Sequence, residues 1–323
     1  MVFSKKYSAV LKGIAILLVL ENHWLCQALG IPLPPLGCVG VFIFLVLSGY
    51  GITVSIQNNN SIIEYSVKRI VKVLIPYVLL LTFMFLVHII NENISPSIQT
   101  NRLLDYLLFI RLGHGAIWYL RLNFYWYVIG YFILVWYLST KLKCKKSILL
   151  SGLLVGSFII CILTRFQRLY VWQFLSFPLG IIIRLSEDKL ICLFKLLYKK
   201  KTLILLTALT CVLFILKKLP YVESRELGLI DTVLQCSLTI VVGFLLIGIS
   251  HFVENIGYVD RILKCIGDNS YELYLSHIAA IDYFYSNAYK NLLTYLLTML
   301  ICFAMLKFYT QKVSPFLLHL LIK

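Results

Sequence analysis

The sequence predicts an all-α integral membrane protein with about ten transmembrane helices and both termini in the cytoplasm. Of its 323 residues, 60% are hydrophobic and only 14% are charged, and the mean hydropathy is +0.89. Apolar runs of about twenty residues, the length that crosses a hydrocarbon core of ~30 Å, recur along the chain. Lysine and arginine gather in every second connection between these runs, as the positive-inside rule requires. Together these observations indicate a polytopic helical bundle.

The apolar runs define the spans, and the cations define their orientation. The connections on one side of the membrane, together with the two termini, hold 21 of the 30 cations, which places both termini in the cytoplasm. A weaker apolar piece, 103–112, predicts a re-entrant or interfacial helix. No internal repeat divides the chain, so we expect a single transmembrane domain over 1–323. The ten predicted spans are 9–28, 37–56, 70–90, 117–139, 147–164, 170–186, 202–218, 228–250, 270–287 and 292–311.

Charge and cysteine content argue against several other classes of protein. The net charge of +16 would suit a nucleic-acid-binding protein, but the cations lie between apolar runs and no zinc-finger or helix-turn-helix spacing is present. We therefore expect no nucleic-acid partner. The nine cysteines form no CxxC pair, and Cys161, Cys211 and Cys302 lie inside apolar runs, so we interpret them as buried hydrophobic residues and expect no metal site.

Two segments near the membrane surface have a specific interpretation. The first apolar run is not followed by a small-residue cleavage site, so we interpret it as a retained first span and not as a signal peptide. The segment 187–201 mixes leucine and phenylalanine with lysine. This composition predicts an amphipathic helix on the anionic cytoplasmic leaflet.

Two ionisable residues interrupt the first predicted span. On an ideal helix Lys12 and His23 point within roughly 20° of each other and stand ~16 Å apart along the axis. Lys12 lies near the cytoplasmic end, where a lysine that reaches out to water is the simpler explanation. His23 lies deeper, and its imidazole can move protons near neutral pH, although a histidine hydrogen-bonded between helices is the alternative.

The second and third spans carry small and basic residues that allow two interpretations. Glycines in the second span favour close packing by a neighbouring helix over contact with a ligand, and Ser48 adds a hydroxyl group. Lys68, Arg69 and Lys72, before the third span, are either topology charges or a binding site for the phosphates of an anionic cofactor. The glycines are Gly37, Gly40, Gly49 and Gly51.

Two later stretches place polar groups at or inside the membrane. Trp118 and Tyr119 fit the aromatic belt of a membrane interface or, alternatively, contact a polar ligand. Ser270, Tyr274 and His277 recur at i, i+4 and i+7, which predicts a polar stripe along one face of a buried helix. Such a stripe needs partners, which are either other helices or a substrate.

Five stretches, taken together, resemble membrane-bound acyltransferase family 3, which includes bacterial O-antigen and capsule O-acetyltransferases. The family opens with a basic residue, a glycine-containing apolar run and a histidine after ten residues. A Gly-Val-Phe-Phe-Ser-Gly-Phe-like signature, basic residues before a proline, a Trp-Phe/Tyr-Leu element and a Ser-Tyr-x-x-Tyr-Leu-x-His element then follow. In this chain the stretches are Lys12 to His23, Gly40 to Tyr50, Lys68 to Tyr77, Trp118 to Leu120 and Ser270 to His277.

The resemblance covers almost the whole chain, with two departures. Lys12 stands where arginine is commoner, which keeps the charge but loses the forked donor geometry. Arg121 and Asn123 follow the Trp-Tyr-Leu element where many members carry an acidic residue, a difference that bears on recognition of the acceptor. We also expect a membrane-only member, without the extracellular hydrolase-like domain that some relatives carry.

The resemblance implies an enzyme of the bacterial cytoplasmic membrane that transfers an acyl group, most often acetyl, from cytoplasmic acyl-CoA to a hydroxyl of a cell-surface or lipid-linked saccharide. It implies that His23 transfers the proton or carries the acyl group transiently, and that Lys12 supports it electrostatically. Lys68, Arg69 and Lys72 would bind the CoA phosphates. The candidates for substrate binding are Ser48, Trp118, Tyr119, Tyr274 and His277.

Two rival functions remain open. A carrier or flippase for a lipid-linked sugar would use Lys12 and His23 to line a pathway, but such proteins commonly have repeated halves or paired broken helices, which the sequence does not display. A polysaccharide polymerase would be expected to have a large outer loop, and the longest one here, 91–116, is short.

Overall fold

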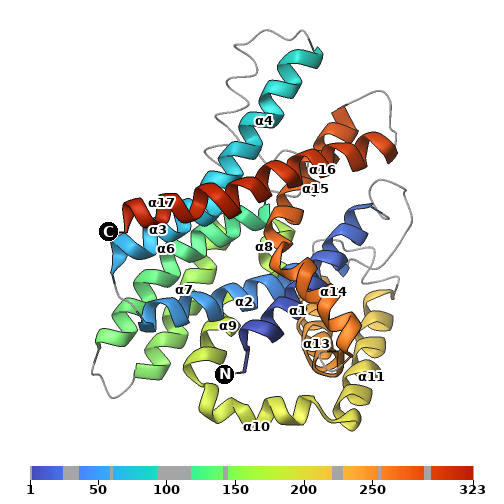
Figure 1. The fold of residues 1–323 in the computed structure, drawn as a ribbon. Helices are drawn as coiled ribbons and strands as arrows, with labels where there is room; N and C mark the ends of the chain where they lie inside the picture. The colour runs from blue at the N-terminus through green and yellow to red at the C-terminus, as the bar shows by residue number, and fades with distance from the viewer. Residues whose placement is uncertain are drawn as a thin grey trace. The chain divides into compact units, whose positions relative to one another are not determined.

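A computed structural model describes residues 2–24, 36–58, 61–92, 118–140, 145–219, 228–253, 256–286 and 292–322. Every regular element within these ranges is a helix, so the all-α class is confirmed for them (Figure 1). The chain forms two compact units: unit 1 is Met1–Asn58 with Leu122–Asp268, and unit 2 is Asn59–Arg121 with Asn269–Lys323. The predicted helix 103–112 lies outside the described residues.

Helix α2 is the centre of unit 1 and packs against α1, α9 and α13. It is buried without interruption from Gly37 to Leu47, as its continuous apolar sequence predicts. The helices of unit 1 are α1 (Lys5–Glu21), α2 (Leu36–Asn58), most of α6 (Trp118–Ser139), α7 (Lys145–Leu163), α8 (Arg168–Trp172), α9 (Ser176–Leu185), α10 (Glu187–Leu197), α11 (Lys200–Lys217), α13 (Leu229–Val253) and α14 (Gly257–Asp268).

Glycines let the backbones of α2 and α9 touch. A Cβ atom added to Gly49 would lie 2.3 Å from a carbonyl oxygen of α9, and one added to Gly180 would lie 2.0 Å from a carbonyl oxygen of α2. Gly40 approaches the backbone of α1 in the same way, at 2.5 Å. The packing interpretation is therefore confirmed for Gly40 and Gly49. It is wrong for Gly51, because no neighbouring element in the described part of the chain lies within 4 Å of the added Cβ there.

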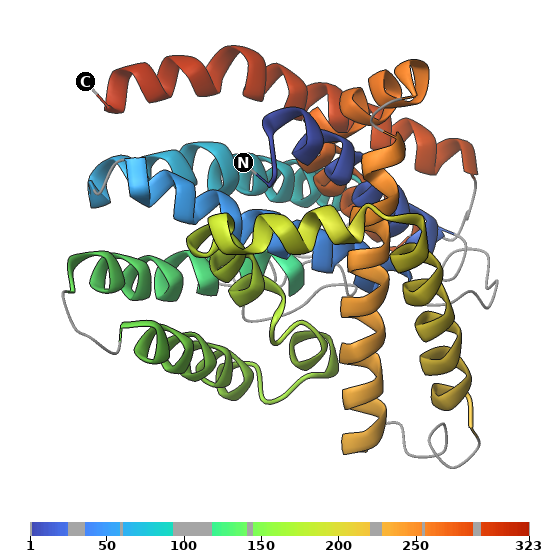
Figure 2. The same cartoon turned by 90° about the horizontal axis from the view of Figure 1, so that it is seen from below.

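The chain bends sharply between α9 and α10. The segment Arg168–Leu185 and the helix Glu187–Leu197 meet at 111°, so α10 runs crosswise before α11 begins, and α11 then packs alongside α13 (Figure 2). Helix α10 buries Phe194 and exposes Lys189 and Lys195. The predicted amphipathic character of 187–201 is confirmed in this helix.

The carboxylate of Glu187 holds the corner between α9 and α10. It accepts hydrogen bonds from the backbone N–H of Val2, from the Tyr50 hydroxyl at 3.0 Å and from the Arg184 guanidinium. Its side chain is only 10% exposed. Burial raises the pKa of this carboxyl, but the hydrogen bonds and the Arg184 charge outweigh burial and hold its pKa below the ordinary value.

Glu187→Gln is expected to change how stability depends on pH. A carboxyl whose pKa is lowered on folding stabilises the protein above its unfolded-state pKa, about 4.3 for glutamate, and this contribution is lost as pH falls through the folded-state pKa. The unfolding temperature of the native protein in detergent should therefore exceed that of the variant at pH 7 and converge with it at acidic pH. Asp188→Asn, at an exposed neighbour, should follow the native profile. A constant difference between native and Glu187→Gln across this pH range would contradict the assignment.

Unit 2 contains two long helices, and each includes a π turn part-way along its length (Figure 1). Ser61 begins the first of them as its N-cap, because its hydroxyl accepts a hydrogen bond from the Glu64 backbone N–H at 3.4 Å. The elements of unit 2 are α3 (Ile62–Arg69), η2 (Ile70–Leu74), α4 (Ile75–Glu92), α15 (Ser270–Ser286), α16 (Leu292–Phe308), η3 (Tyr309–Val313) and α17 (Ser314–Leu321).

Pro76 leaves a backbone carbonyl in the π turn η2 without its usual N–H donor. Proline has no backbone N–H, and in the π register its acceptor would be the carbonyl five residues earlier, that of Val71. The hydroxyl of Tyr309 donates to this carbonyl at 2.8 Å. The hydroxyl of Tyr271 donates to the Val73 carbonyl at 2.7 Å. Two tyrosines thus satisfy backbone groups for which the membrane interior offers no water.

Tyr309→Phe is expected to destabilise the protein by about 1–2 kcal/mol, because it leaves the buried Val71 carbonyl without a donor. The loss should appear as a lower unfolding temperature in detergent. Tyr258→Phe removes the same hydroxyl from a side chain that is 75% exposed, and it should leave that temperature unchanged. Equal unfolding temperatures for native and Tyr309→Phe would contradict the proposed role of the hydroxyl.

The structure supports a membrane protein, and six of the ten predicted spans meet a length and hydropathy criterion among the described residues. They are Leu36–Asn58, Ile62–Leu86, Trp118–Ser139, Lys146–Leu163, Leu229–Val253 and Leu292–Leu321, with a seventh if the bent pair counts as one span. The other predicted spans are helical but short, as in α1 and α15 with 17 residues each, or carry several lysines, as in α11. The count of ten and the cytoplasmic placement of both termini stay predictions.

The cysteines in the described ranges differ in their exposure. Cys161 and Cys302 are buried, as interpreted from the sequence. Cys211 is exposed on α11, beside exposed apolar residues such as Ile215, so the buried interpretation is wrong there. In a membrane protein such a face contacts lipid, which is as apolar as a protein core.

Candidate functional site

The residues predicted from the sequence to form the site fall into two groups, one in each unit. Lys12, His23 and Ser48 belong to unit 1. The remaining candidates, Lys68, Arg69, Lys72, Trp118, Tyr119, Tyr274 and His277, belong to unit 2.

Helix α14 crosses α1 at the level of Lys12. A Cβ added to Gly13 would lie 2.1 Å from the Leu263 carbonyl oxygen, and one added to Gly267 would lie 1.8 Å from the Ala9 carbonyl oxygen, so the backbones are in contact. The crossing brings the carboxylate of Asp268 close enough to Lys12 to act on its charge. Lys12 is half-buried and has an anionic neighbour, which the sequence interpretation had not identified.

His23 lies on a π turn that follows α1. The helix widens at residues 22–24, and His23 is half-buried there. The side chain of Asn22 packs against Gly37, at 3.0 Å from a Cβ placed on that glycine, so the end of α1 lies beside the start of α2. Single π turns occur frequently at functional sites. Ser48 is half-buried further along α2, one residue before the crossing with α9.

The three candidate cations before α4 lie on adjacent turns of one helix. Lys68 and Arg69 end α3. Lys72 follows within the π turn η2, four residues after Lys68 and three after Arg69. Lys68 forms an ion pair with Glu64, and the Arg69 guanidinium lies 5.2 Å from the centre of the Tyr65 ring. Lys72 is exposed. The structure therefore brings this predicted group together.

An aromatic cluster forms in unit 2 around Tyr274. Its ring lies 5.0 Å from that of Tyr119 and 5.2 Å from that of His277, both in edge-on arrangements. His277 is fully buried, Tyr274 is 2% exposed, and Trp118 and Ser270 are 6% exposed. The predicted polar stripe of 270–277 is therefore buried, and it is brought together with Tyr119.

A further polar cluster in unit 1 was missed from the sequence. Asp231, at the start of α13, bridges two cations: its carboxylate lies 3.6 Å from Arg168 of α8 and 3.3 Å from Lys217 of α11. Lys217 also donates to Gln235. Both cations face the Trp172 ring, at 4.8 Å and 5.2 Å from its centre. Each of these residues lies at or near the end of a predicted span, and that recurrence was the available sequence signal.

The comparison with protein families covers nearly the whole chain. The model of acyltransferase family 3, described as an acyltransferase domain, matches residues 6–308. The chain belongs to this family. Membership indicates a membrane acyltransferase, and the matched range includes all five motif stretches and most of both units. No curated protein and no solved structure matches this acyltransferase.

Proposed function

We propose that this acyltransferase moves an acyl group, most often acetyl, from cytoplasmic acyl-CoA to a hydroxyl of a cell-surface or lipid-linked saccharide, and that it does so in the bacterial cytoplasmic membrane. The family match over residues 6–308 carries the proposal, because it fixes the reaction class. The nature of donor and acceptor follows from what the family resemblance implies.

In the proposed reaction His23 acts as the general base. Its imidazole takes the proton of the acceptor hydroxyl while the oxygen attacks the thioester carbonyl carbon, so that a C–O bond forms and the C–S bond breaks. The imidazolium then returns the proton to the departing CoA thiolate. Lys12, on the same helix but ~16 Å away along its axis, supports the site by its long-range positive charge. The Asp268 carboxylate, which the crossing of α14 brings near, acts on the Lys12 charge.

Binding of the two substrates is assigned to separate groups of side chains. Lys68, Arg69 and Lys72 lie on adjacent turns of one helix and present forked and point-charge donors, which suit the phosphates of CoA. The aromatic cluster of Tyr119, Tyr274 and His277 offers ring faces and polar edges of the kind that suits a sugar, and Trp118 and Ser48 are further contacts. No metal ion takes part in this proposal.

Purified protein in liposomes tests the reaction class and separates it from a carrier. We expect CoA release from acetyl-CoA to require added saccharide and to yield an ester-linked acetyl group. A carrier or flippase would instead move the lipid-linked sugar across the bilayer in the absence of acetyl-CoA. In cells, deletion of the gene should remove an ester-linked acyl group from the surface glycans. Saccharide transport without any CoA release would overturn the proposal.

A further inference from the structure

A compact group of charges lies at the end of unit 1 that carries His23. Asp231 is 5% exposed and Gln235 is 2% exposed, and the side chains of Arg168 and Lys217 are 39% and 19% exposed. Two cations and one carboxylate leave a net charge of +1. A buried carboxylate such as that of Asp231 is costly unless it is paired, and the two cations provide that pairing.

The contacts around α2 connect this cluster to the end of α1. Asn22, next to His23, packs against Gly37 at the start of α2. The following residue, Cys38, accepts a hydrogen bond through its carbonyl from the Gln173 side chain at 2.8 Å. The charges of both cluster cations also act on the Cys38 side chain. The cluster and His23 therefore lie at the same end of unit 1.

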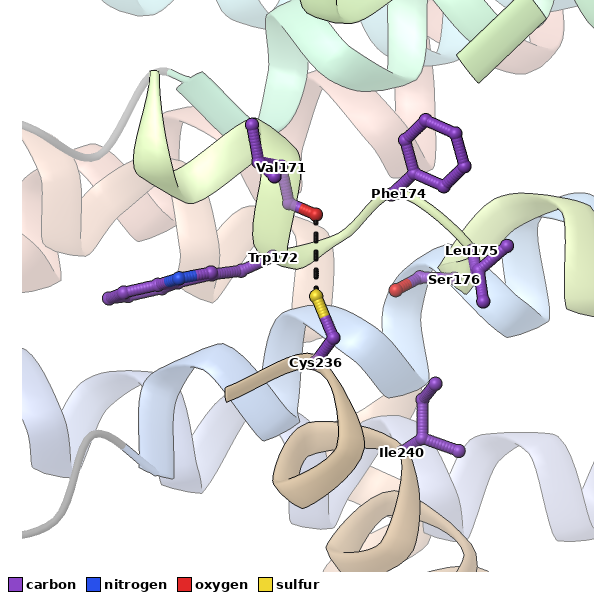
Figure 3. A pocket seen from close by; sticks show the side chains of 7 residues that line it. All are labelled: Val171, Trp172, Phe174, Leu175, Ser176, Cys236 and Ile240. Atoms are coloured by element: carbon purple, nitrogen blue, oxygen red, sulfur yellow. Dashed lines mark hydrogen bonds between the residues drawn. The ribbon is translucent and has the colours of Figure 1, made fainter. Parts of the chain in front are cut away.

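An apolar cavity of about 150 Å³ adjoins the cluster through Trp172, which lines both (Figure 3). Figure 3 shows Cys236 and Ile240 of α13 on one side, with the Cys236 thiol directed at the Val171 carbonyl at 3.6 Å. Leu175, also in the lining, is 38% exposed, so the lining reaches the outer surface of the helices. In a membrane this surface faces the lipid chains.

One observation at the cluster itself points to an anionic ligand. The indole N–H of Trp172 is buried and has no hydrogen-bond acceptor within the described part of the chain. A buried donor without an acceptor is costly. A phosphate oxygen between Arg168, Lys217 and Trp172 would accept from all three, with the arginine fork and the lysine point charge as complementary donors.

We propose that Arg168, Lys217 and Trp172 bind the phosphate of a lipid-linked saccharide, the acceptor of the reaction, and that the adjoining cavity takes part of its apolar chain. This inference rests on the proposed function. The phosphate site would hold the acceptor at the end of unit 1 where His23, the proposed general base, lies. The cationic side chains and the apolar cavity lie side by side, which fits a ligand with an anionic group and an apolar chain. Bulk phospholipid has the same chemistry, so the experiment must distinguish the two.

Binding of a polyprenyl phosphate is measured without any acyl donor. The measured quantity is the rise in the thermal unfolding temperature of the full-length protein in detergent when the ligand is added. We expect the unfolding temperature to rise with polyprenyl phosphate and to stay unchanged with the matching polyprenol or with inorganic phosphate. Equal protection by phosphatidylglycerol would overturn the proposal in favour of bulk lipid. Equal protection by polyprenol or by inorganic phosphate would also overturn it, because either the charge or the chain would then be irrelevant.

Charge variants separate a phosphate site from a structural link between α8, α11 and α13. Lys217→Gln should weaken polyprenyl phosphate binding about tenfold, the effect of one charge-assisted contact. Asp231→Asn should leave binding equal or tighter, because it removes a negative charge beside the phosphate. Lys218→Gln, at the exposed neighbouring lysine, is the matched control and should bind as the native protein does. A structural link predicts that Lys217→Gln and Asp231→Asn lower the unfolding temperature alike, with no change in ligand response, and that result would overturn the proposal.

Failure of this inference is distinguishable from failure of the proposed function. Saccharide-dependent CoA release without protection by polyprenyl phosphate would leave acyl transfer intact and reject the phosphate site. Protection that follows the predicted order of variants, without any CoA release, would support the site and reject the enzymatic assignment.

Discussion

His23→Ala is expected to lower the rate of acyl transfer by roughly 10²- to 10⁴-fold, the usual contribution of one positioned general acid–base group. The rate is measured as saccharide-dependent CoA release per folded molecule. The side chain lies on a π turn at the end of α1 and is only half-buried, so its removal should leave the packing of α1 against α2 and α14 intact. The variant should therefore reach the membrane and unfold near the native temperature.

His319→Ala is the control for this substitution, because His319 is an exposed histidine on α17. It should retain native activity. Lys12→Arg should also retain most activity, since it keeps the charge beside Asp268, whereas Lys12→Met should not. Native activity in His23→Ala would remove the catalytic assignment and leave this histidine as a packed polar residue. An equal loss in His319→Ala would show that the assay reports general destabilisation.

Local pattern predicted much of the fold and part of the site. The apolar composition of 37–56 identified the span that forms α2, and two of its glycines, Gly40 and Gly49, were identified as close contacts. The stripe of residues within a few positions of one another was also placed correctly: Ser270, Tyr274 and His277 are all buried on α15. In each case the information lies within two turns of a helix, where sequence spacing fixes geometry.

Contacts between distant segments were not predictable in this way. Asp268 reaches Lys12 because α14 crosses α1 through Gly13 and Gly267, and nothing local to Lys12 encodes that partner. Arg168, Lys217 and Asp231 meet only once α8, α11 and α13 assemble. Cys211 was misplaced for a different reason: an apolar residue in a span can face either lipid or protein, and hydrophobicity alone does not separate the two.

Gly180→Ala is expected to destabilise unit 1 strongly. The added methyl group would lie 2.0 Å from the Val46 carbonyl oxygen and 2.8 Å from the Tyr50 backbone nitrogen. Backbone atoms cannot move aside by rotamer changes, so α9 must separate from α2, the centre of unit 1, at a cost of about 3 kcal/mol. The yield of folded protein in detergent and its unfolding temperature should both fall. Gly51→Ala adds the same methyl group to α2 where nothing lies within 4 Å, and it should behave as native.

Gly49 of α2, which faces α9 at the same contact, allows a test of why Gly180→Ala lowers stability. Gly49→Ala inserts a methyl group from the other helix, 2.3 Å from the Phe177 carbonyl oxygen, and should also destabilise unit 1. If both substitutions act by forcing the same two helices apart, the double variant should lose less stability than the two single losses added together, because the first methyl group already opens part of the space that the second needs. Strict additivity would instead mean that each alanine strains its own surroundings and that the α2–α9 contact is not the shared cause.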